Sequence, residues 1–481
     1  MNVRIQTVPR SVMIVATAIT AAMTAGVAVV AAPAAAALTA ARARGTTRTA
    51  TITSISCPSA GNCAAGGFYT DSSETEHAFV VTERTGRWGN AIAVPGVAAL
   101  SPHNSHVNSV SCGAAGNCVA GGYYQDTSFR QHAFLVNERN GRWRRAFQVR
   151  GTSALVFPQI DSLSCSSAGD CSAAGGRPAF VVSERSGRWG RAIVVPGLAE
   201  LTKLKPFVFM NSISCGSAGD CAAGGTYSPA SLRRSAFVVS EQSGRWREAI
   251  RVPGIVTLNT SGQAAVNSVS CPSPSECVAG GDYLGTPGSG AFVVSARNGR
   301  WGRAIVIRGF AALGAHAASI RALSCASPGN CVAGGSYLVK TGAQLVFVVS
   351  DRNGHWGRAI KVPGIATLNL GGMAAVTSVS CGSPGNCAAG GYYAPDTGGS
   401  QLAFVVSERN GRWRKALEVP GLAALHTGQD EVNSVSCASA SSCTAGGEYS
   451  PPPFECPLST CPAFVVGERD GQWGKAFAIR F

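Results

Sequence analysis

The chain has 481 residues and is poor in charged side chains and in the short motifs that mark common enzyme families. It contains no Gly-x-Ser-x-Gly, His-Glu-x-x-His, P-loop or dinucleotide-binding fingerprint, so it carries no standard signature of a hydrolase, a metalloprotease or a nucleotide-binding enzyme. No stretch of the repeats described below shows helical spacing of apolar residues, which argues against a helical fold. Acidic residues are scarce too: 25 Asp and Glu stand against 40 Lys and Arg, and the formal net charge is +15.

What the sequence does contain is one pattern written eight times. Residues 266–309 show it in full: VNSVSCPSPSECVAGGDYLGTPGSGAFVVSARNGRWGRAIVIRG. The chain has eight tryptophans, one in each repeat, and the first cysteines of successive repeats are 50 to 56 residues apart. A period of this length is typical of a four-stranded propeller blade and too long for most solenoids. The repeats start near residues 51, 106, 159, 209, 265, 319, 375 and 431.

Each repeat contains four short runs with the composition of β-strands, rich in Val, Phe, Tyr and Ile. In the fifth repeat they are 266–271, 277–283, 291–296 and 301–307. A two-residue turn such as Asn298-Gly299 joins the third and fourth runs, which predicts a type I′ hairpin with φ > 0 at both residues. Side chains grow larger from the first run to the last, as a blade that widens toward its rim requires. We therefore predict an all-β protein with a single eight-bladed β-propeller over residues 51–481, built from four antiparallel strands per blade.

The hairpin between the third and fourth runs resembles that of the BNR or Asp-box propellers and, more loosely, of the photosystem-assembly propellers. In the third repeat it reads SERSGRW over residues 183–189, against the Asp-box pattern S-x-D-x-G-x-T-W. The serine, glycine and tryptophan match, whereas Arg185 stands at the aspartate position. The resemblance extends over nearly all the repeats and implies a propeller. Because the aspartate is absent, it does not imply sialidase chemistry.

The chain has 18 cysteines, and all of them can pair locally. Such an even, local pattern in an exported protein predicts disulfides, one per blade and a ninth in the last repeat. A zinc site is less favoured, because each repeat offers two thiols and no histidine at a fixed offset, so we expect no metal and no cofactor. The predicted pairs are Cys57 with Cys63, Cys112 with Cys118, Cys165 with Cys171, Cys215 with Cys221, Cys271 with Cys277, Cys325 with Cys331, Cys381 with Cys387, Cys437 with Cys443, and Cys456 with Cys461.

The N-terminal residues have the pattern of an export signal. Arg4 and Arg10 precede an uncharged apolar run over 11–31, and small residues follow up to residue 37. We predict a signal peptide over 1–37, a linker over 38–50, and a secreted or cell-envelope-associated mature protein. The apolar run is also long enough to remain as an uncleaved membrane anchor. Frequent Ala, Gly and Arg are typical of a high-GC bacterial gene.

The positive charge is concentrated on the hairpin between the third and fourth runs. Such a basic ring would attract anionic polymers, for example teichoic acids, acidic glycans or phospholipid surfaces. The alternative is that these arginines pack on tryptophans and pair with the repeated glutamates, such as Glu83, Glu138, Glu184 and Glu408. The candidate polyanion-binding residues are Arg142, Arg144, Arg145, Arg188, Arg191, Arg300, Arg303, Arg412, Arg414 and Lys415.

Strands alternate in direction, so the first-to-second and third-to-fourth turns share one face of the propeller. The variable connections share the other face, which is a second candidate binding surface. The third repeat has almost no loop there, since Gly176 leads through Arg177 and Pro178 to the next run. Residues that break the repeat are candidates for a single site: His103, His106, Asp126, Arg130, His132, Asp282, Arg321, Asp396, Asp430, Glu431 and Glu448.

We expect a non-enzymatic, secreted propeller that binds a protein partner or a cell-envelope polymer or glycan, and no catalytic residues are assigned. The main alternative is a sialidase-like glycan-cleaving enzyme, in which Asp282 and Glu448 would be a carboxylate pair near the axis. A purely structural surface protein is a third possibility. Nucleic-acid binding is not expected, because the chain has no basic runs interleaved with aromatic residues.

Overall fold

The computed structural model describes residues 49–71, 73–101, 103–202, 207–228, 233–286, 288–424, 429–449 and 463–481. The described residues lie in one compact unit, Thr46–Phe481. The predicted signal peptide, all but the last two residues of the linker, and the ninth cysteine pair, Cys456 with Cys461, lie outside the described residues. Within the described ranges, no helix is both long and apolar enough to cross a membrane.

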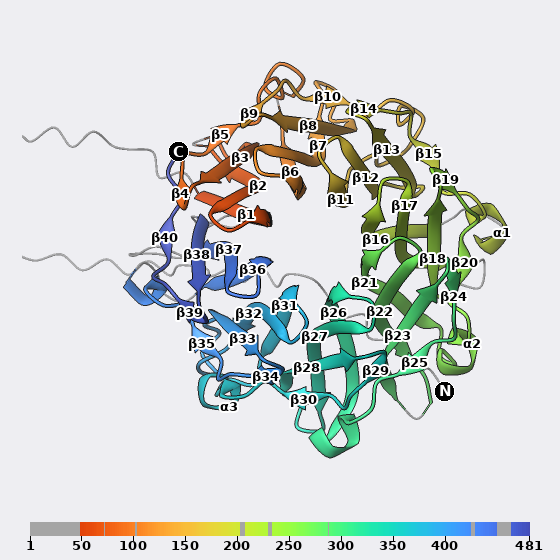
Figure 1. Ribbon diagram of the computed structural model, residues 1–481, viewed down its shortest axis with the longest axis vertical. Helices are drawn as coiled ribbons and strands as arrows, with labels where there is room; N and C mark the ends of the chain where they lie inside the picture. Colours follow the sequence, from red (N-terminus) through yellow and green to blue (C-terminus); the bar gives the residue numbers. More distant parts are fainter. Residues whose placement is uncertain are drawn as a thin grey trace, which may run out of the picture. The chain divides into compact units, whose positions relative to one another are not determined.

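This unit consists of eight antiparallel sheets, one from each repeat (Figure 1). The first blade contains β1 (Thr49–Ser59), β2 (Asn62–Thr70) and β3 (Glu76–Arg84), followed by an outermost run in two pieces, β4 (Arg87–Trp88) and β5 (Ile92–Ala93). Both pieces pair with β3. This is the predicted four-stranded blade with its fourth strand broken.

The other seven blades repeat this order. The innermost strands are β6 (Ser105–Ala114), β11 (Ser162–Ser167), β16 (Phe207–Ser217), β21 (Gln263–Ser273), β26 (Ala315–Ser327), β31 (Ala374–Ser383) and β36 (Asp430–Ser439). The second strands are β7 (Asn117–Gln125), β12 (Asp170–Gly175), β17 (Asp220–Ser228), β22 (Glu276–Leu284), β27 (Asn330–Val339), β32 (Asn386–Tyr393) and β37 (Ser442–Tyr449). The third strands are β8 (Gln131–Arg139), β13 (Phe180–Arg185), β18 (Ser235–Gln242), β23 (Ser289–Arg297), β28 (Gln344–Arg352), β33 (Leu402–Arg409) and β38 (Ala463–Arg469).

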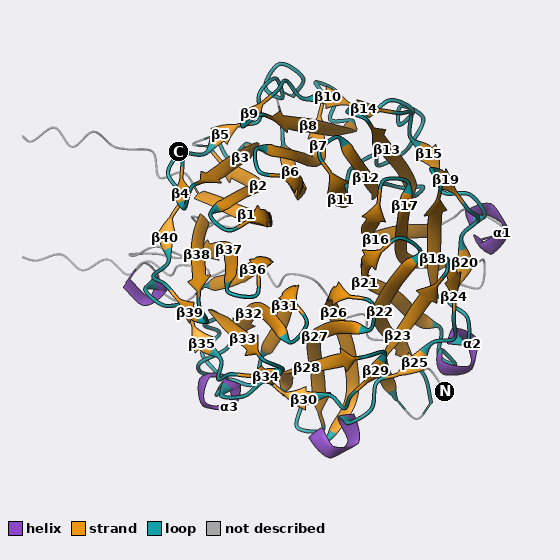
Figure 2. Ribbon diagram, viewed as in Figure 1, coloured by secondary structure: helices purple, strands orange, loops and turns teal. Residues whose placement is uncertain are grey.

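The outermost runs are likewise in two pieces: β9 (Arg142–Trp143) and β10 (Phe147–Gln148), β14 (Arg188–Trp189) and β15 (Ile193–Val194), β19 (Arg245–Trp246) and β20 (Ile250–Arg251), β24 (Arg300–Trp301) and β25 (Ile305–Val306), β29 (His355–Trp356) and β30 (Ile360–Lys361), β34 (Arg412–Trp413) and β35 (Leu417–Glu418), β39 (Gln472–Trp473) and β40 (Phe477–Ala478). Short helical turns lie at the rim, in the connections between blades (Figure 2). They are α1 (Leu198–Thr202), α2 (Ile255–Leu258), η1 (Phe310–Leu313), α3 (Ile365–Leu368) and η2 (Leu422–Ala424).

The innermost strands form a closed circle, in which each contacts the next and β36 contacts β1. The predicted eight-bladed propeller is therefore confirmed. Each of the eight apolar clusters joins residues of two neighbouring blades; Phe404 and Val376 of blade seven, for example, pack with Val348 of blade six. Stability thus resides in the contacts between blades as much as within them.

The hairpin turns have the predicted geometry. Both central residues have positive φ in all eight, for example 50° at Asn140 and 73° at Gly141. The two kinds of turn also meet, since the Gly141 N–H donates to the Gly116 carbonyl at 2.8 Å, and the corresponding glycine makes an equivalent bond in each of the first seven blades; in blade eight the Asp470 N–H donates to the Ser441 carbonyl instead. This places the disulfide turns and the third-to-fourth hairpins on one face, hereafter the turn face.

The break in each outermost run has a cause outside its own sheet. In blade five the Ala304 N–H donates to the carbonyl of Pro253 in blade four at 2.8 Å, and every blade has an equivalent bond. For one residue the outermost run leaves its own sheet and bonds to the preceding blade. The side chain after this break then points to solvent. These side chains are 37% to 52% exposed; they are Ile92, Phe147, Ile193, Ile250, Ile305, Ile360, Leu417 and Phe477.

At the inner edge, serines join the blades. The Ser54 and Ser56 hydroxyls of blade one accept hydrogen bonds from the Val110 and Cys112 N–H groups of blade two, both at 3.0 Å. The repeated Ser-x-Ser-Cys sequence supplies equivalent bonds around the ring. An edge strand exposes unpaired N–H groups, and these hydroxyls satisfy them.

The ring closes without exchange of a strand, because blades one and eight are each built from consecutive strands. The closing interface uses the bonds found elsewhere. Ser434 accepts from the Ile55 N–H at 3.0 Å, and the Ala91 N–H donates to the Arg480 carbonyl at 2.7 Å. Phe481 adds edge-on ring contacts with Phe79 and Tyr69.

Eight of the nine predicted disulfides are formed, one in each blade between the first and second strands, with Cα atoms 3.9 to 4.1 Å apart. Among the described cysteines none is free. A set of this kind is typical of an oxidising, extracytoplasmic compartment. The bridges join Cys57 to Cys63, Cys112 to Cys118, Cys165 to Cys171, Cys215 to Cys221, Cys271 to Cys277, Cys325 to Cys331, Cys381 to Cys387, and Cys437 to Cys443.

The ninth predicted bridge, between Cys456 and Cys461, stays a prediction. Both cysteines fall in the stretch 450–462, which lies outside the described residues. The confirmed bridges all close the turn between the first two strands of a blade, whereas this pair follows the second strand of blade eight.

Candidate functional site: the basic rim and a pocket between blades

The repeated glutamate at the end of the third strand binds an arginine of the preceding blade. Arg139 Nη2 lies 3.4 Å from Glu184 Oε1, and Arg409 Nη2 lies 2.6 Å from Glu468 Oε1. These glutamates are buried, Glu468 completely. Burial raises the pKa of the Glu184 carboxyl, while hydrogen bonds from Asn137 and the charge of Arg139 lower it. The arginine in each case directly follows the glutamate of its own strand.

The repeated glutamates are thus paired with Arg84, Arg139, Arg352 and other third-strand arginines rather than with the ten candidate polyanion-binding residues. All ten candidates are exposed. Within the described part of the chain, none of the ten takes part in an ion pair. Their charge is therefore not neutralised by a partner in the fold.

The ten side chains lie on the outermost run, either in its first piece or in the break that follows. These outermost pieces, such as β9, β14 and β24, lie at the perimeter of the propeller (Figure 1), and the ten side chains are hereafter called the basic rim. The stems of some are held in place: a Cβ added to Gly96 would lie 2.5 Å from Cγ of Arg145, and one added to Gly151 would lie 2.7 Å from Cγ of Arg191. The aliphatic part packs on the glycine turn of the preceding blade and leaves the charged end in solvent.

The series of interblade pairs is interrupted around blade five. At the interface of blades four and five, Gln242 and Ala296 occupy the positions of arginine and glutamate. At the next interface the acid is Asp351, one methylene shorter than glutamate, and Arg297 does not reach it within 4 Å. These two neighbouring interfaces therefore lack the ion pair, as does the closing interface, where Arg469 of blade eight does not reach Glu83 of blade one within 4 Å.

A cavity of about 620 Å³ lies at the second of these interfaces, against about 210 and 240 Å³ for the corresponding clefts between blades two and three and between blades six and seven. Ala296 and Asp351 line it where longer carboxylates stand in other blades. The shorter side chains account for part of the added space.

Some buried polar atoms of this pocket have no hydrogen-bond partner. Asp351 is 5% exposed, and its Oδ1 has no hydrogen-bond partner among the described residues; nor does the Trp356 indole N–H. In five blades the same indole donates to the preceding blade, as Trp301 does to Ser240 at 3.0 Å, whereas the indole of Trp413 in blade seven also has no partner among the described residues. Burial raises the pKa of Asp351 to about 6, against smaller lowering effects of His355 and Arg297.

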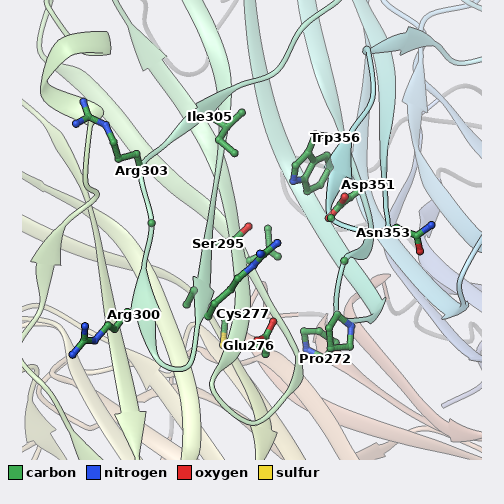
Figure 3. Close-up of a pocket in the computed structure, with 17 residues that line it drawn as sticks. Pro272, Glu276, Cys277, Ser295, Arg300, Arg303, Ile305, Asp351, Asn353 and Trp356 are labelled. Carbon is green, nitrogen blue, oxygen red and sulfur yellow. The ribbon is translucent and has the colours of Figure 1, made fainter.

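Figure 3 shows Trp356 and Asp351 together on one wall of the pocket and Arg300 and Arg303 on the opposite side. The guanidinium groups of the two arginines point away from Asp351. They therefore flank the pocket, whose lining also includes the polar or charged side chains of Arg297, Ser295 and Glu276 and the apolar side chain of Ile305.

The residues that break the repeat are mostly engaged in local contacts. His132 Nε2 lies 2.8 Å from Asp126 Oδ2, and the His103 ring stacks on Phe129 with centroids 3.9 Å apart. The carboxylates proposed as a glycosidase pair sit in different blades: Asp282 accepts from Asn267 and Ser319, whereas Glu448 accepts from Thr51. Glu448 has Glu431 directly opposite, and burial together with Glu448 raises the pKa of Glu431 to about 7. No group of three His, Cys, Asp or Glu side chains in the described ranges is placed to hold a metal ion.

Comparison with known proteins gives the following result. No protein-family model matches the chain, and no curated protein does. Among solved structures, Sqt1 from Chaetomium thermophilum is 11% identical, with 82% of this chain and 93% of that chain covered and a TM-score of 0.48. The BP39L lectin from Burkholderia pseudomallei is 13% identical, with 90% and 99% covered and a TM-score of 0.44, and an ulvan lyase is 10% identical, with 87% and 90% covered and a TM-score of 0.37. These similarities are distant.

Proposed function

We propose that the protein is a non-enzymatic, secreted binding scaffold for an anionic, hydroxyl-rich polymer of the cell envelope, such as an acidic glycan or a polyol phosphate. The observation that carries this proposal is the basic rim, ten exposed side chains outside every ion pair of the described fold. Unpaired charge of one sign attracts polymers of the opposite sign and speeds their encounter.

The spacing of the rim suits a polymer better than a small anion. Arg142, Arg144 and Arg145 of blade two are followed by Arg188 and Arg191 of blade three, so one chain has contacts on adjacent blades. Each exposed contact contributes little, typically under about 1 kcal/mol, but contacts within one chain add through effective concentration.

The pocket between blades five and six provides a place for one unit of such a polymer. A ligand hydroxyl donates to Asp351 Oδ1, and the Trp356 N–H donates to a ligand oxygen, so that both of these buried atoms of the pocket gain a partner. Arg300 and Arg303, at the edge of the pocket, bind anionic groups of the adjoining units. Buried polar atoms left without a partner are costly, so a ligand that completes them gains affinity.

Export and family membership belong to the same proposal. The disulfides and the charged-then-apolar N-terminal sequence support secretion, either with cleavage near residue 37 or with the segment kept as an anchor. The Ser-x-x-x-Gly-x-Trp hairpins support a relationship to the BNR or Asp-box propellers.

The test is binding of the mature protein to immobilised teichoic-type poly(glycerol phosphate) and to polygalacturonate over a salt series. The variant Arg142→Gln/Arg144→Gln/Arg145→Gln should bind about tenfold more weakly, since three contacts of about 0.5 kcal/mol each are lost. It should also show a shallower salt dependence. The matched control, Arg233→Gln/Arg234→Gln/Lys340→Gln, removes equal charge from the variable loops and should bind nearly as the parent does.

Equal losses in the two variants would show attraction by net charge alone and contradict the rim as the site. Binding that does not change with salt, or capture of a protein partner with no affinity for either polymer, would overturn the proposal.

A further inference from the structure

The third blade is cut short on the face opposite the turn face, where the variable connections lie. Its first three strands, β11 to β13, have six residues each, whereas β16 of the next blade has 11 and β6 of the preceding blade has 10. The loop between the second and third strands is reduced to a few residues around Arg177. The neighbouring blades therefore rise above blade three, and a notch remains between them.

The connection from blade two enters this notch and divides it. The Arg177 N–H donates to the Phe157 carbonyl at 3.1 Å, so residue 157 is fixed against the shortened hairpin. Cavities of about 520 and 380 Å³ lie beside it, and both are lined by Phe157 and Gln131. The notch is thus a preformed concave surface with two adjoining compartments.

Aromatic rings are unusually exposed here. Phe129, Phe157 and Phe207 are 66%, 51% and 50% exposed, although the eight repeated phenylalanines of the third strands are fully buried. Phe129 and Phe157 line the larger compartment, and Phe157 and Phe209 line the smaller one. Exposed rings gathered at a concave site mark a binding surface rather than a part of the core.

Arg177 stands among these rings. Its guanidinium carbon lies 4.0 Å from the centroid of Phe209, 5.6 Å from that of Phe207 and 5.9 Å from that of Phe157. Stacking occupies the flat face of the guanidinium. The N–H groups at its edge make no hydrogen bond with another described residue, although Asp161 of the same compartment is near enough for the charge of Arg177 to oppose the rise in pKa that burial causes there. An arginine held in this way presents its donors to a carboxylate in a fixed direction.

The floor of the smaller compartment is polar. Gln131 Nε2 donates to Gln159 Oε1 at 2.8 Å, Gln159 Nε2 donates to Asp161, and Asp161 Oδ2 accepts from the Gly176 N–H at 3.2 Å. This chain of bonds holds amide and carboxylate groups in place, with Asn211 exposed beside them. Fixed amides and carboxylates bind ligand hydroxyls, which both donate and accept.

We propose that this notch binds a saccharide that contains a uronic acid residue, with the carboxylate on Arg177, a sugar ring against Phe157, and hydroxyls on Gln131 and Gln159. A bare anion would not need the exposed rings, and an apolar ligand would leave Arg177 and the amides unsatisfied. A saccharide with a carboxylate uses all three kinds of group. The site is independent of the basic rim, since it shares no residue with it and lies on the other face.

The test is saturation-transfer NMR and calorimetry with the mature protein and four probes: the trimers of galacturonate, mannuronate and cellouronate, and uncharged maltotriose. We expect at least one uronate trimer to bind and maltotriose to bind at least tenfold more weakly. Arg177→Gln should weaken uronate binding at least tenfold, and Phe157→Ala should weaken it similarly, with little change in the thermal midpoint because both side chains are exposed.

The matched control is the rim variant Arg142→Gln/Arg144→Gln/Arg145→Gln, which should leave trimer binding unchanged and thereby separates this site from the proposed rim. The inference is overturned if no uronate trimer binds, if maltotriose binds equally well, or if Arg177→Gln binds as the parent does. Arg177→Lys provides a second check. Lysine keeps the positive charge but has no planar guanidinium to stack on the rings, so this variant should bind more tightly than Arg177→Gln and more weakly than the parent.

Discussion

A buried ion pair between blades seven and eight gives a quantitative test of how the blades are joined. Glu468 is fully buried, its Oε1 is 2.6 Å from Arg409 Nη2, and the Arg409 side chain is only 10% exposed. Ser407 also donates to the same oxygen at 2.6 Å. Replacing Glu468 by alanine leaves a buried guanidinium without its counter-charge, and we expect the free energy of unfolding to fall by about 3 to 5 kcal/mol.

One interface of the protein naturally lacks both members of this ion pair. At the interface of blades four and five, Gln242 and Ala296 stand where Arg409 and Glu468 stand. Gln242 Nε2 still reaches the Gly299 carbonyl of the neighbouring hairpin, at 3.4 Å. The double variant Arg409→Gln/Glu468→Ala should therefore recover at least about 2 kcal/mol relative to Glu468→Ala, because no buried charge remains unpaired.

The assay is guanidinium chloride unfolding of the non-reduced protein at pH 7, followed by tryptophan fluorescence, for the parent, both single variants and the double variant. A double-mutant cycle then isolates the coupling energy. A loss below about 1 kcal/mol for Glu468→Ala, or a double variant as unstable as the sum of the single ones, would refute the reasoning. Such a result would mean that water reaches the pair in solution.

Three further predictions concern other sites. Burial raises the pKa of Asp351 from 3.8 to about 6, so the folded state binds this proton more tightly than the unfolded state does. The free energy of unfolding should therefore rise as the pH falls from 7 to 4, and Asp351→Asn should flatten that part of a denaturation-against-pH curve. Ala322 stands where other blades have the first serine of the Ser-x-Ser-Cys sequence, which accepts from an N–H group of the next blade. Ala322→Ser should supply an acceptor for the Val379 N–H and raise the free energy of unfolding by about 1 kcal/mol. An unchanged value would mean that water already accepts this hydrogen bond. Replacing Cys381 and Cys387 together by alanine opens one short loop and should cost about 2 kcal/mol by calorimetry; no loss would assign the bridges no part in stability.

The sequence by itself determined the number of blades, the strand order, the turn type and the disulfide in each blade. All of these depend on residues close together in one repeat. Asn140-Gly141 specifies its turn through the φ values that glycine and asparagine tolerate, and Cys112 faces Cys118 because a short turn joins their strands. Eight copies of one pattern make such local information reliable.

Only the tertiary structure decided what lies between blades. From the sequence, the repeated glutamates were possible partners of the hairpin arginines. In the structure they bind the last arginine of the third strand in the preceding blade, about 50 residues away in sequence. The Ala304 N–H turns to the carbonyl of Pro253 in another blade, and this contact leaves Ile305 exposed at the next position. The pocket at Asp351 and the notch at Arg177 likewise depend on neighbours that a single repeat does not specify, because the fit between two blades is set by packing across the interface.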